Sequence, residues 1–254
     1  MIREHVQKGL LAGEKNFRWR ATEITRLEGF TDAVFAFAVT LLVVSLEVPR
    51  TFSELIFAMK GFIAFAICFA LLVQVWYEHY TFSRRYGLQT AYTVFLNSAL
   101  LFVVLFYVYP LKFIFTLLVA QISGGATAAT NVNDMLRIDQ SASLMVIYSL
   151  GFTAVFGVFT LLYTYAYRKR TLLELNEYEA LLTRKSILEH LFMAVLGVMI
   201  AITAELLPAR LAGAAGYLFC LIGVYHTIAG TIYGKKEKAV LAKMEAASQS
   251  NPAP

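Results

Sequence analysis

A single carboxylate lies inside a membrane-length apolar segment near the start of this chain. Between Gly29 and Leu46 the only charged side chain is Asp32, which follows Phe30 and Thr31. A charged side chain is costly in hydrocarbon, so it is rare there and by default marks an ion pathway, a proton relay or a contact between helices. Asp32 can therefore either take part in cation or proton movement or accept hydrogen bonds that hold this segment against its neighbours.

Other polar side chains are predicted to lie at a similar depth. Trp76 and His79 stand at the end of a second apolar segment, and Asn97 stands near the start of a third. Because no water is available in the bilayer core, polar groups there must satisfy one another. We expect a network in which Asp32 accepts a hydrogen bond from the Trp76 indole N–H or contacts His79 or Asn97. Such a network serves either as a rigid clamp on the first helix or as part of a path for ions.

The first apolar segment also has a continuous apolar face. At about 100° per residue around a helix, this face consists of Phe30, Ala33, Phe37, Leu41 and Val44. Thr40 flanks the face, Arg26 lies at its start, and Asp32 points to nearly the opposite side. An apolar face of this kind packs either inside one chain or around an axis shared by several chains.

The composition predicts that membrane helices position these residues. Hydrophobic residues make up 59% of the 254 residues, against roughly 45–50% in a soluble domain, and the mean hydropathy is +0.63. Since roughly 20 apolar residues span the hydrocarbon core as a helix, we predict an all-α integral membrane protein with six transmembrane helices in a single six-helix repeat. The expected spans are 29–46, 55–77, 91–118, 142–167, 187–207 and 211–233.

The distribution of Lys and Arg predicts the orientation of these spans. Basic residues are concentrated before the first span, after the second, in a charged connector at 168–185 and after the sixth, whereas few lie in the other connections. Because positive charge favours the cytoplasmic side, we expect a multi-pass protein of the cell membrane with both termini in the cytoplasm. The expected parts are a cytoplasmic N-terminal segment (1–25), a six-helix transmembrane domain (26–233) and a cytoplasmic tail (234–254) that frays.

No motif indicates an enzyme. The sequence contains no HExxH, no GxSxG and no glycine-rich phosphate loop, which are the signatures of common catalytic sites. The four histidines are too scattered for a metal site, and Cys68 and Cys220 lie in apolar runs that predict small core residues. We therefore expect no catalytic activity, no metal and no cofactor. The excess of basic residues at helix ends is explained by membrane topology, so we also expect no nucleic acid partner.

The run RLEGFTDAVFAFAVTLL resembles the opening helix of the transmembrane protein 175 family of potassium channels. The family signature is Arg, three residues, then Phe-Ser-Asp, and here its positions hold Arg26, Phe30, Thr31 and Asp32, with Thr in place of Ser. The resemblance extends to Trp76, His79 and Asn97. It implies a member of the prokaryotic type, with one six-helix repeat per chain, that assembles as a homotetramer in membrane lipids and conducts potassium ions.

The same resemblance implies a pore lined by the first helix of each subunit. Its apolar gate rings would be Phe37, Leu41 and Val44, and Thr40 would contribute to potassium preference. Phe37 is larger than the Ile or Leu usual in the family at that position. No TVGYG filter is present, so selectivity would depend on hydroxyls, hydrated ions and pore width. Two other functions stay open: a proton-coupled secondary transporter that uses Asp32, and a structural membrane protein.

Overall fold

The computed structural model describes residues 17–21, 23–44, 49–124 and 135–250, and every regular element in these ranges is a helix. The seven α-helices described are α2 (Arg26–Val44), α3 (Phe52–Lys60), α4 (Phe62–Tyr86), α5 (Ala91–Ile122), α7 (Ser141–Arg168), α8 (Glu177–Leu206) and α9 (Leu221–Ser250). Two 3-10 helices, η1 (Ile138–Gln140) and η2 (Ala212–Cys220), precede α7 and α9. The predicted all-α architecture is confirmed for these residues.

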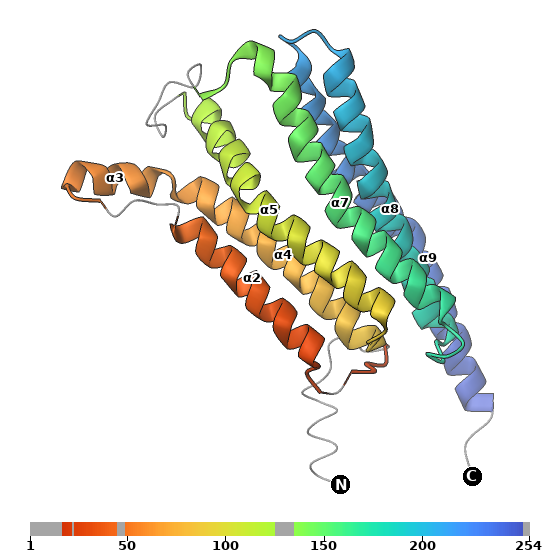
Figure 1. Ribbon diagram of the computed structural model, residues 1–254. Helices are drawn as coiled ribbons and strands as arrows, with labels where there is room; N and C mark the ends of the chain where they lie inside the picture. The colour runs from red at the N-terminus through yellow and green to blue at the C-terminus, as the bar shows by residue number, and fades with distance from the viewer. Residues whose placement is uncertain (1–16, 22, 45–48, 125–134, 251–254) are drawn as a thin grey trace.

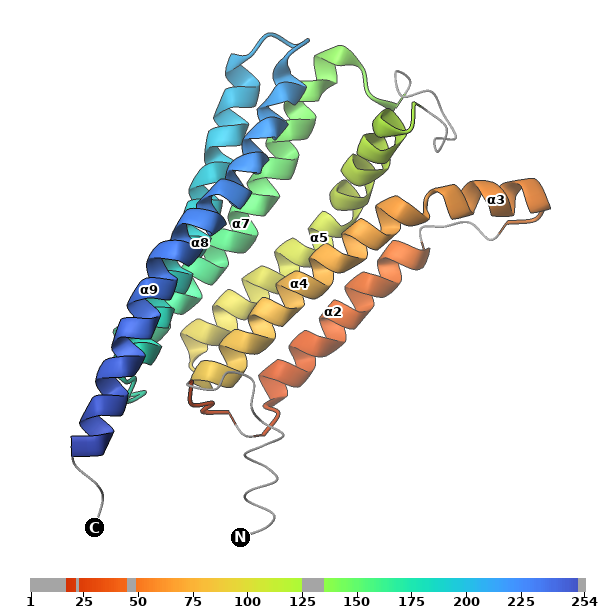
Figure 2. The ribbon, with the colours of Figure 1, turned by 180° about the vertical axis from the view of Figure 1, so that it is seen from behind.

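The helices form two groups that lie side by side. In the first group α2 packs on α4 and α5, and in the second group α8 packs on α7 and α9. Contacts between α5 and α7 join the two groups, as Figures 1 and 2 show. The start of α2, the end of α4 and the end of α9 lie at the same end of the bundle (Figure 1).

Five of the described helical segments are long and apolar enough to cross a membrane. They are Phe62–Tyr86, Ala91–Ile122, Ile138–Arg168, Glu177–Leu206 and Ala212–Met244. The chain is therefore a multi-pass membrane protein. The described part of α2 has 19 residues, and at about 1.5 Å per residue it approaches the thickness of the hydrocarbon core.

The second predicted span, 55–77, is wrong at both ends. Gly61 separates α3 from α4, and α3 projects sideways from the bundle in both ribbon views (Figures 1 and 2). The polar run after Tyr77 stays helical until Tyr86 because several of its side chains, including His79 and Tyr86, are buried against other helices. Hydropathy alone ends a helix too early where polar side chains have partners inside the bundle.

The boundaries of the last two spans also differ from the prediction. Much of the predicted connector 168–185 is helical, because α8 begins at Glu177 with a capping box between Asn176 and Glu179. The predicted frayed tail continues α9 to Ser250, and the ion pair between Lys243 and Glu177, at 3.0 Å, ties it to α8. Of the connection predicted between the third and fourth spans, residues 125–134 lie outside the described residues. Of the two cysteines, Cys68 is buried as predicted, whereas Cys220 is exposed.

Candidate pore helix and its anchors

One face of α2 is buried and the other is open. Phe35, Ala38 and Leu42 are at most 3% exposed and pack in the main hydrophobic core. On the other side Phe30 is 58% exposed and Phe37 is 57% exposed. The remaining exposed residues of this face are Gly29, Ala33, Ala36, Thr40 and Val43. These residues define what we call the open face of α2, which no other described part of the chain covers.

The open face is rotated relative to the predicted apolar stripe. Leu41 is half-buried and packs against the core, so it lies at the border of the open face, whereas Thr40 lies within it. Asp32 is half-buried and flanks the open face instead of opposing it. The side chain of Val44 lies outside the described residues. The rotation follows from packing, because Ala38 and Leu42 must point at α4 and α5 to enter the core.

The start of α2 is held by a buried ion pair. Glu28 is 2% exposed, and its Oε1 lies 3.2 Å from Nε of Arg84 on α4. The same glutamate closes a capping box, since Thr25 Oγ1 accepts a hydrogen bond from the Glu28 backbone N–H at 3.1 Å and Oε2 accepts one from the Thr25 N–H at 3.4 Å. One carboxylate thus starts the helix and attaches it to α4.

The predicted polar network exists as two separate pairs. The indole N–H of Trp76 donates to Oδ1 of Asp32 at 2.8 Å. His79 Nε2 and Asn97 Oδ1 are 2.8 Å apart, and these two buried residues join α4 to α5. Thr31 is fully buried and donates within its own helix to the carbonyl of Leu27 at 2.8 Å. Asp32 therefore attaches α2 to α4, while the His79–Asn97 pair holds together the helices on which α2 rests.

The opposite end of α2 is attached to α5. The Nζ of Lys112 donates to the backbone carbonyl of Leu42 at 3.2 Å. A cation at the C-terminal end of a helix is favourable, because the last carbonyls have no partner within the helix and carry partial negative charge. With Glu28 near the start, Asp32 in between and Leu42 near the end, α2 is fixed along its buried side. Arg26 is exposed at the start of the open face.

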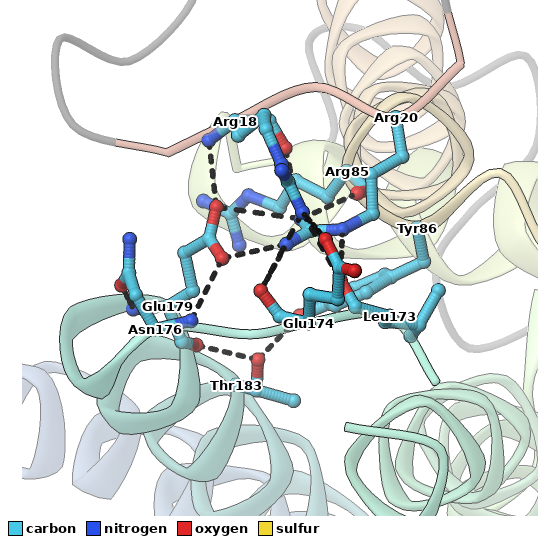
Figure 3. Close-up of polar contacts among 9 residues, drawn as sticks. All are labelled: Arg18, Arg20, Arg85, Tyr86, Leu173, Glu174, Asn176, Glu179 and Thr183. Carbon is cyan, nitrogen blue, oxygen red and sulfur yellow. Dashed lines mark hydrogen bonds and ion pairs between the residues drawn. The ribbon is translucent and has the colours of Figure 1, made fainter. Parts of the chain in front are cut away.

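A second polar cluster, shown in Figure 3, ties the segment before α2 to α8. Arg20 donates from Nη2 to Oε2 of Glu179 at 2.6 Å and from Nε to the carbonyl of Leu173 at 2.7 Å. Glu179 is 1% exposed and also accepts from the backbone N–H of Arg18 at 2.8 Å and of Asn176 at 3.1 Å. The buried carboxylate therefore accepts hydrogen bonds from one side chain and two backbone N–H groups.

The end of α4 completes this attachment. The backbone N–H groups of Arg20 and Ala21 both donate to the carbonyl of Arg84, at 3.0 and 3.3 Å. Phe17 is buried and meets the ring of Tyr86 edge to face at 5.9 Å between centroids. The segment 17–21 thus contacts both groups of helices just before the chain enters α2.

Comparison with known proteins decides the family. The model of the family described as endosomal/lysosomal potassium channel TMEM175 matches residues 26–107, which contain α2, α3, α4 and part of α5. A protein of Marivirga tractuosa named potassium channel is 41% identical over 234 residues, covering 89% of this chain and 94% of that protein. The chain belongs to the TMEM175 family. The resemblance seen in the motif from Arg26 to Asp32 is confirmed.

Two further TMEM175-related comparisons agree with this assignment. A protein of Chamaesiphon minutus, also named potassium channel, is 30% identical over 97 residues, covering 35% of this chain and 48% of that protein. A crystal structure of a variant of the potassium channel MtTMEM175, in complex with a nanobody–MBP fusion protein, matches with a TM-score of 0.77 at 40% identity. That match covers 87% of this chain and 98% of the other. Membership in a channel family also confirms that the chain is not an enzyme.

Sequence reasoning missed several anchors of this TMEM175 helix. Arg84 was counted only among the basic residues after the second span, and Glu28 and Glu179 were assigned no role, although each of the three is largely buried in an ion pair. Two local signals were available: Thr25 to Glu28 and Asn176 to Glu179 both have the spacing of a capping box. These signals predict where the helices start, but they do not reveal which cation elsewhere in the chain pairs with each carboxylate.

Replacing Asp32 with alanine is expected to lower the free energy of unfolding by roughly 1–3 kcal/mol, because the Trp76 N–H loses its hydrogen-bond acceptor. Asp32→Asn should cost less, since an amide oxygen can still accept that hydrogen bond. Thermal unfolding of the purified protein in detergent, with Asp139→Ala as the control at a residue with an exposed side chain, measures the effect. An Asp32→Ala variant of unchanged stability with altered ion preference would place Asp32 in the conduction path instead.

Proposed function

We propose that this chain is a potassium-preferring cation channel of the cell membrane. The observation that carries the proposal is its 41% identity, over nearly the whole chain, to a protein named potassium channel. In this proposal the chain forms a homotetramer and α2 of each subunit lines a central pore. The helix α2, the first in chain order, then spans the membrane as well and brings the number of transmembrane helices to six. Both termini lie in the cytoplasm, membrane lipids surround the outer helices, and K⁺ is the permeant ion.

The open face of α2 supports this arrangement. It joins apolar side chains, Phe30, Ala33 and Phe37, to the hydroxyl of Thr40. The Thr40 Oγ1 donates its hydrogen to the carbonyl of Ala36 at 2.7 Å, so its oxygen lone pairs remain to face a cation. Four such faces around one axis would form a narrow apolar pore with one ring of hydroxyls. In that pore Phe37 forms the main constriction, Leu41 and Val44 form the next rings, and Arg26 lies at the cytoplasmic mouth.

Ion flux from liposomes tests the channel proposal directly. Vesicles that contain the purified protein should release K⁺ down its gradient faster than Na⁺, without any proton gradient, and protein-free vesicles should not. Flux that requires a proton gradient and saturates would indicate a coupled transporter. Absence of flux above the protein-free level would leave only a structural role.

Replacing Thr40 with alanine is expected to preserve cation flux but to reduce the preference for K⁺ over Na⁺ by roughly fivefold. This magnitude corresponds to the loss of about 1 kcal/mol of ion–hydroxyl interaction. Reversal potentials under mixed-ion conditions measure it. Thr203→Ala is the matched control, because Thr203 is half-buried on α8, away from α2, and makes the same local bond, to the carbonyl of Met199 at 2.7 Å. Equal selectivity in the two variants would remove Thr40 from the ion path.

A cysteine on the open face is expected to crosslink between subunits. In a Cys220→Ser background, Ala33→Cys should yield covalent dimers with a short bismaleimide, because equivalent residues face one another across the proposed axis. Ile202→Cys serves as the control, since Ile202 is 55% exposed on α8, away from α2. The product is measured by denaturing electrophoresis of membranes. Crosslinking of Ile202→Cys alone would assign the interface to another helix.

A further inference from the structure

A cavity of about 450 Å³ lies between the two groups of helices, apart from the proposed pore. Residues of α4, α5, α7, α8 and α9 line it, and its lining includes no described residue of α2. Its size falls within the range of roughly 300–1,000 Å³ that holds drug-sized ligands. The cavity is therefore large enough for an organic molecule with a substantial apolar body.

The walls of this cavity are apolar and aromatic over most of their area. Leu72, Phe152, Phe156 and Met193 are among the lining residues, and the rings of Phe152 and Phe156 lie 4.6 Å apart between centroids. Aromatic rings of this kind offer an apolar surface and also attract cations to their faces. A ligand that fits these walls carries an apolar body.

Ionisable side chains enter the same cavity from three helices. Glu78 comes from α4, Glu189 and His190 come from α8, and His226 comes from α9. All of them belong to helical segments long and apolar enough to cross a membrane. Since carboxylates in such segments are costly and by default functional, two of them in one cavity favour an occupant that carries positive charge.

The hydrogen bonding of His190 narrows the chemistry further. Its Nδ1 lies 2.6 Å from the backbone carbonyl of Ser186, and a carbonyl only accepts, so Nδ1 carries the hydrogen. In the neutral ring Nε2 is then an acceptor. It lies 3.7 Å from Oε2 of Glu78, which is also an acceptor and is beyond hydrogen-bonding distance. A single donor group placed beside these two atoms is within hydrogen-bonding reach of both.

We propose that this cavity binds a hydrophobic amine. The ammonium group donates hydrogen bonds to the Glu78 carboxylate and to Nε2 of His190, and Glu189 adds favourable negative charge. The apolar body packs against Phe152 and Phe156. An ammonium group supplies three donors and a positive charge, which suits the acceptors that the cavity presents. This site is separate from the proposed pore, so a result that refutes one of the two proposals leaves the other untouched.

Fluorescence titration with dansylcadaverine tests the proposal. This probe is a primary amine with an apolar fluorescent ring, and its N-acetyl derivative has the same ring without the charge. The full chain in phosphatidylcholine nanodiscs should bind the amine saturably above the signal of empty nanodiscs. The acetylated probe should bind at least about tenfold more weakly, a difference of about 1.4 kcal/mol. Equal binding of the two probes would mean that the cavity takes a neutral chain such as a lipid tail, and would overturn the proposal.

Two variants locate the bound amine. Glu78→Gln should weaken binding of dansylcadaverine about tenfold, whereas Glu205→Gln, at an exposed position on α8 outside the lining, should not. Val155→Trp should abolish binding by filling the cavity while Glu78 stays in place. Equal affinities of the Glu78 and Glu205 variants, or no saturable binding by the wild-type protein, would overturn the proposal. The comparison of the two probes on the wild-type protein needs no variant, so the test survives even if Glu78→Gln fails to fold.

Discussion

Replacing Phe37 with alanine or asparagine is expected to raise basal cation flux by at least about tenfold. A tenfold change corresponds to removal of roughly 1.4 kcal/mol from the barrier to permeation. The large, exposed ring of Phe37 makes this the largest functional effect that we expect from a substitution in α2. Potassium flux from liposomes at a matched protein-to-lipid ratio measures it.

The reason is the geometry of the proposed pore. Phe37 is 57% exposed on the open face of α2, and four such rings around one axis leave a narrow, dry constriction. Apolar constrictions stop ions because water leaves them and the ion cannot carry its hydration shell through. Alanine widens the ring, and asparagine lets water wet it. Both changes should therefore increase flux, although by different routes.

The control for this experiment is another exposed phenylalanine. Phe102 is 71% exposed on α5, and Phe102→Ala should leave basal flux unchanged. Unchanged flux in both Phe37 variants would exclude this residue as the gate and would remove the main structural argument for α2 as the pore helix. An equal rise in the Phe102 variant would indicate a general loosening of the bundle.

Replacing Arg20 with alanine is expected to lower the free energy of unfolding by roughly 3–5 kcal/mol, the usual cost of leaving one partner of a buried ion pair alone. The side chains of Arg20 and Glu179 are only 11% and 2% exposed, and their charged atoms are 2.6 Å apart. Without Arg20 the Glu179 carboxylate stays buried with its backbone N–H donors but loses the ion pair to this guanidinium. Thermal unfolding of the purified protein in detergent measures the loss.

A neighbouring arginine provides the matched control. Arg18 pairs with Glu174 at 3.3 Å, but the two side chains are 58% and 77% exposed. Exposed ion pairs contribute only about 0–1 kcal/mol, so Arg18→Ala should have a small effect. A similar loss of stability in both variants would mean that the segment 17–21 contributes through its backbone contacts and not through the buried ion pair.

The sequence alone sufficed for the membrane class and the family. Long apolar runs must become helices in a bilayer, because hydrocarbon offers no hydrogen-bonding partner to an unpaired backbone. The motif from Arg26 to Asp32 is contiguous, so it could be compared without knowledge of the fold. The hydrogen bond between Asp32 and Trp76 was also among the expected contacts, because few donors occur at that depth.

Only the tertiary structure decided how α2 is rotated and what holds it. The partners of Glu28 and Glu179 lie on other segments of the chain, at Arg84 and Arg20, and nothing in the local sequence distinguishes them from other cations near helix ends. A periodic apolar pattern defines a stripe along the helix, but it does not determine which side of the helix is buried. The packing of residues such as Ala38 and Leu42 on α4 and α5 sets the rotation of α2 about its axis. That rotation places Thr40 on the open face and Leu41 at its border, because the buried side of α2 is set by the shape of its neighbours.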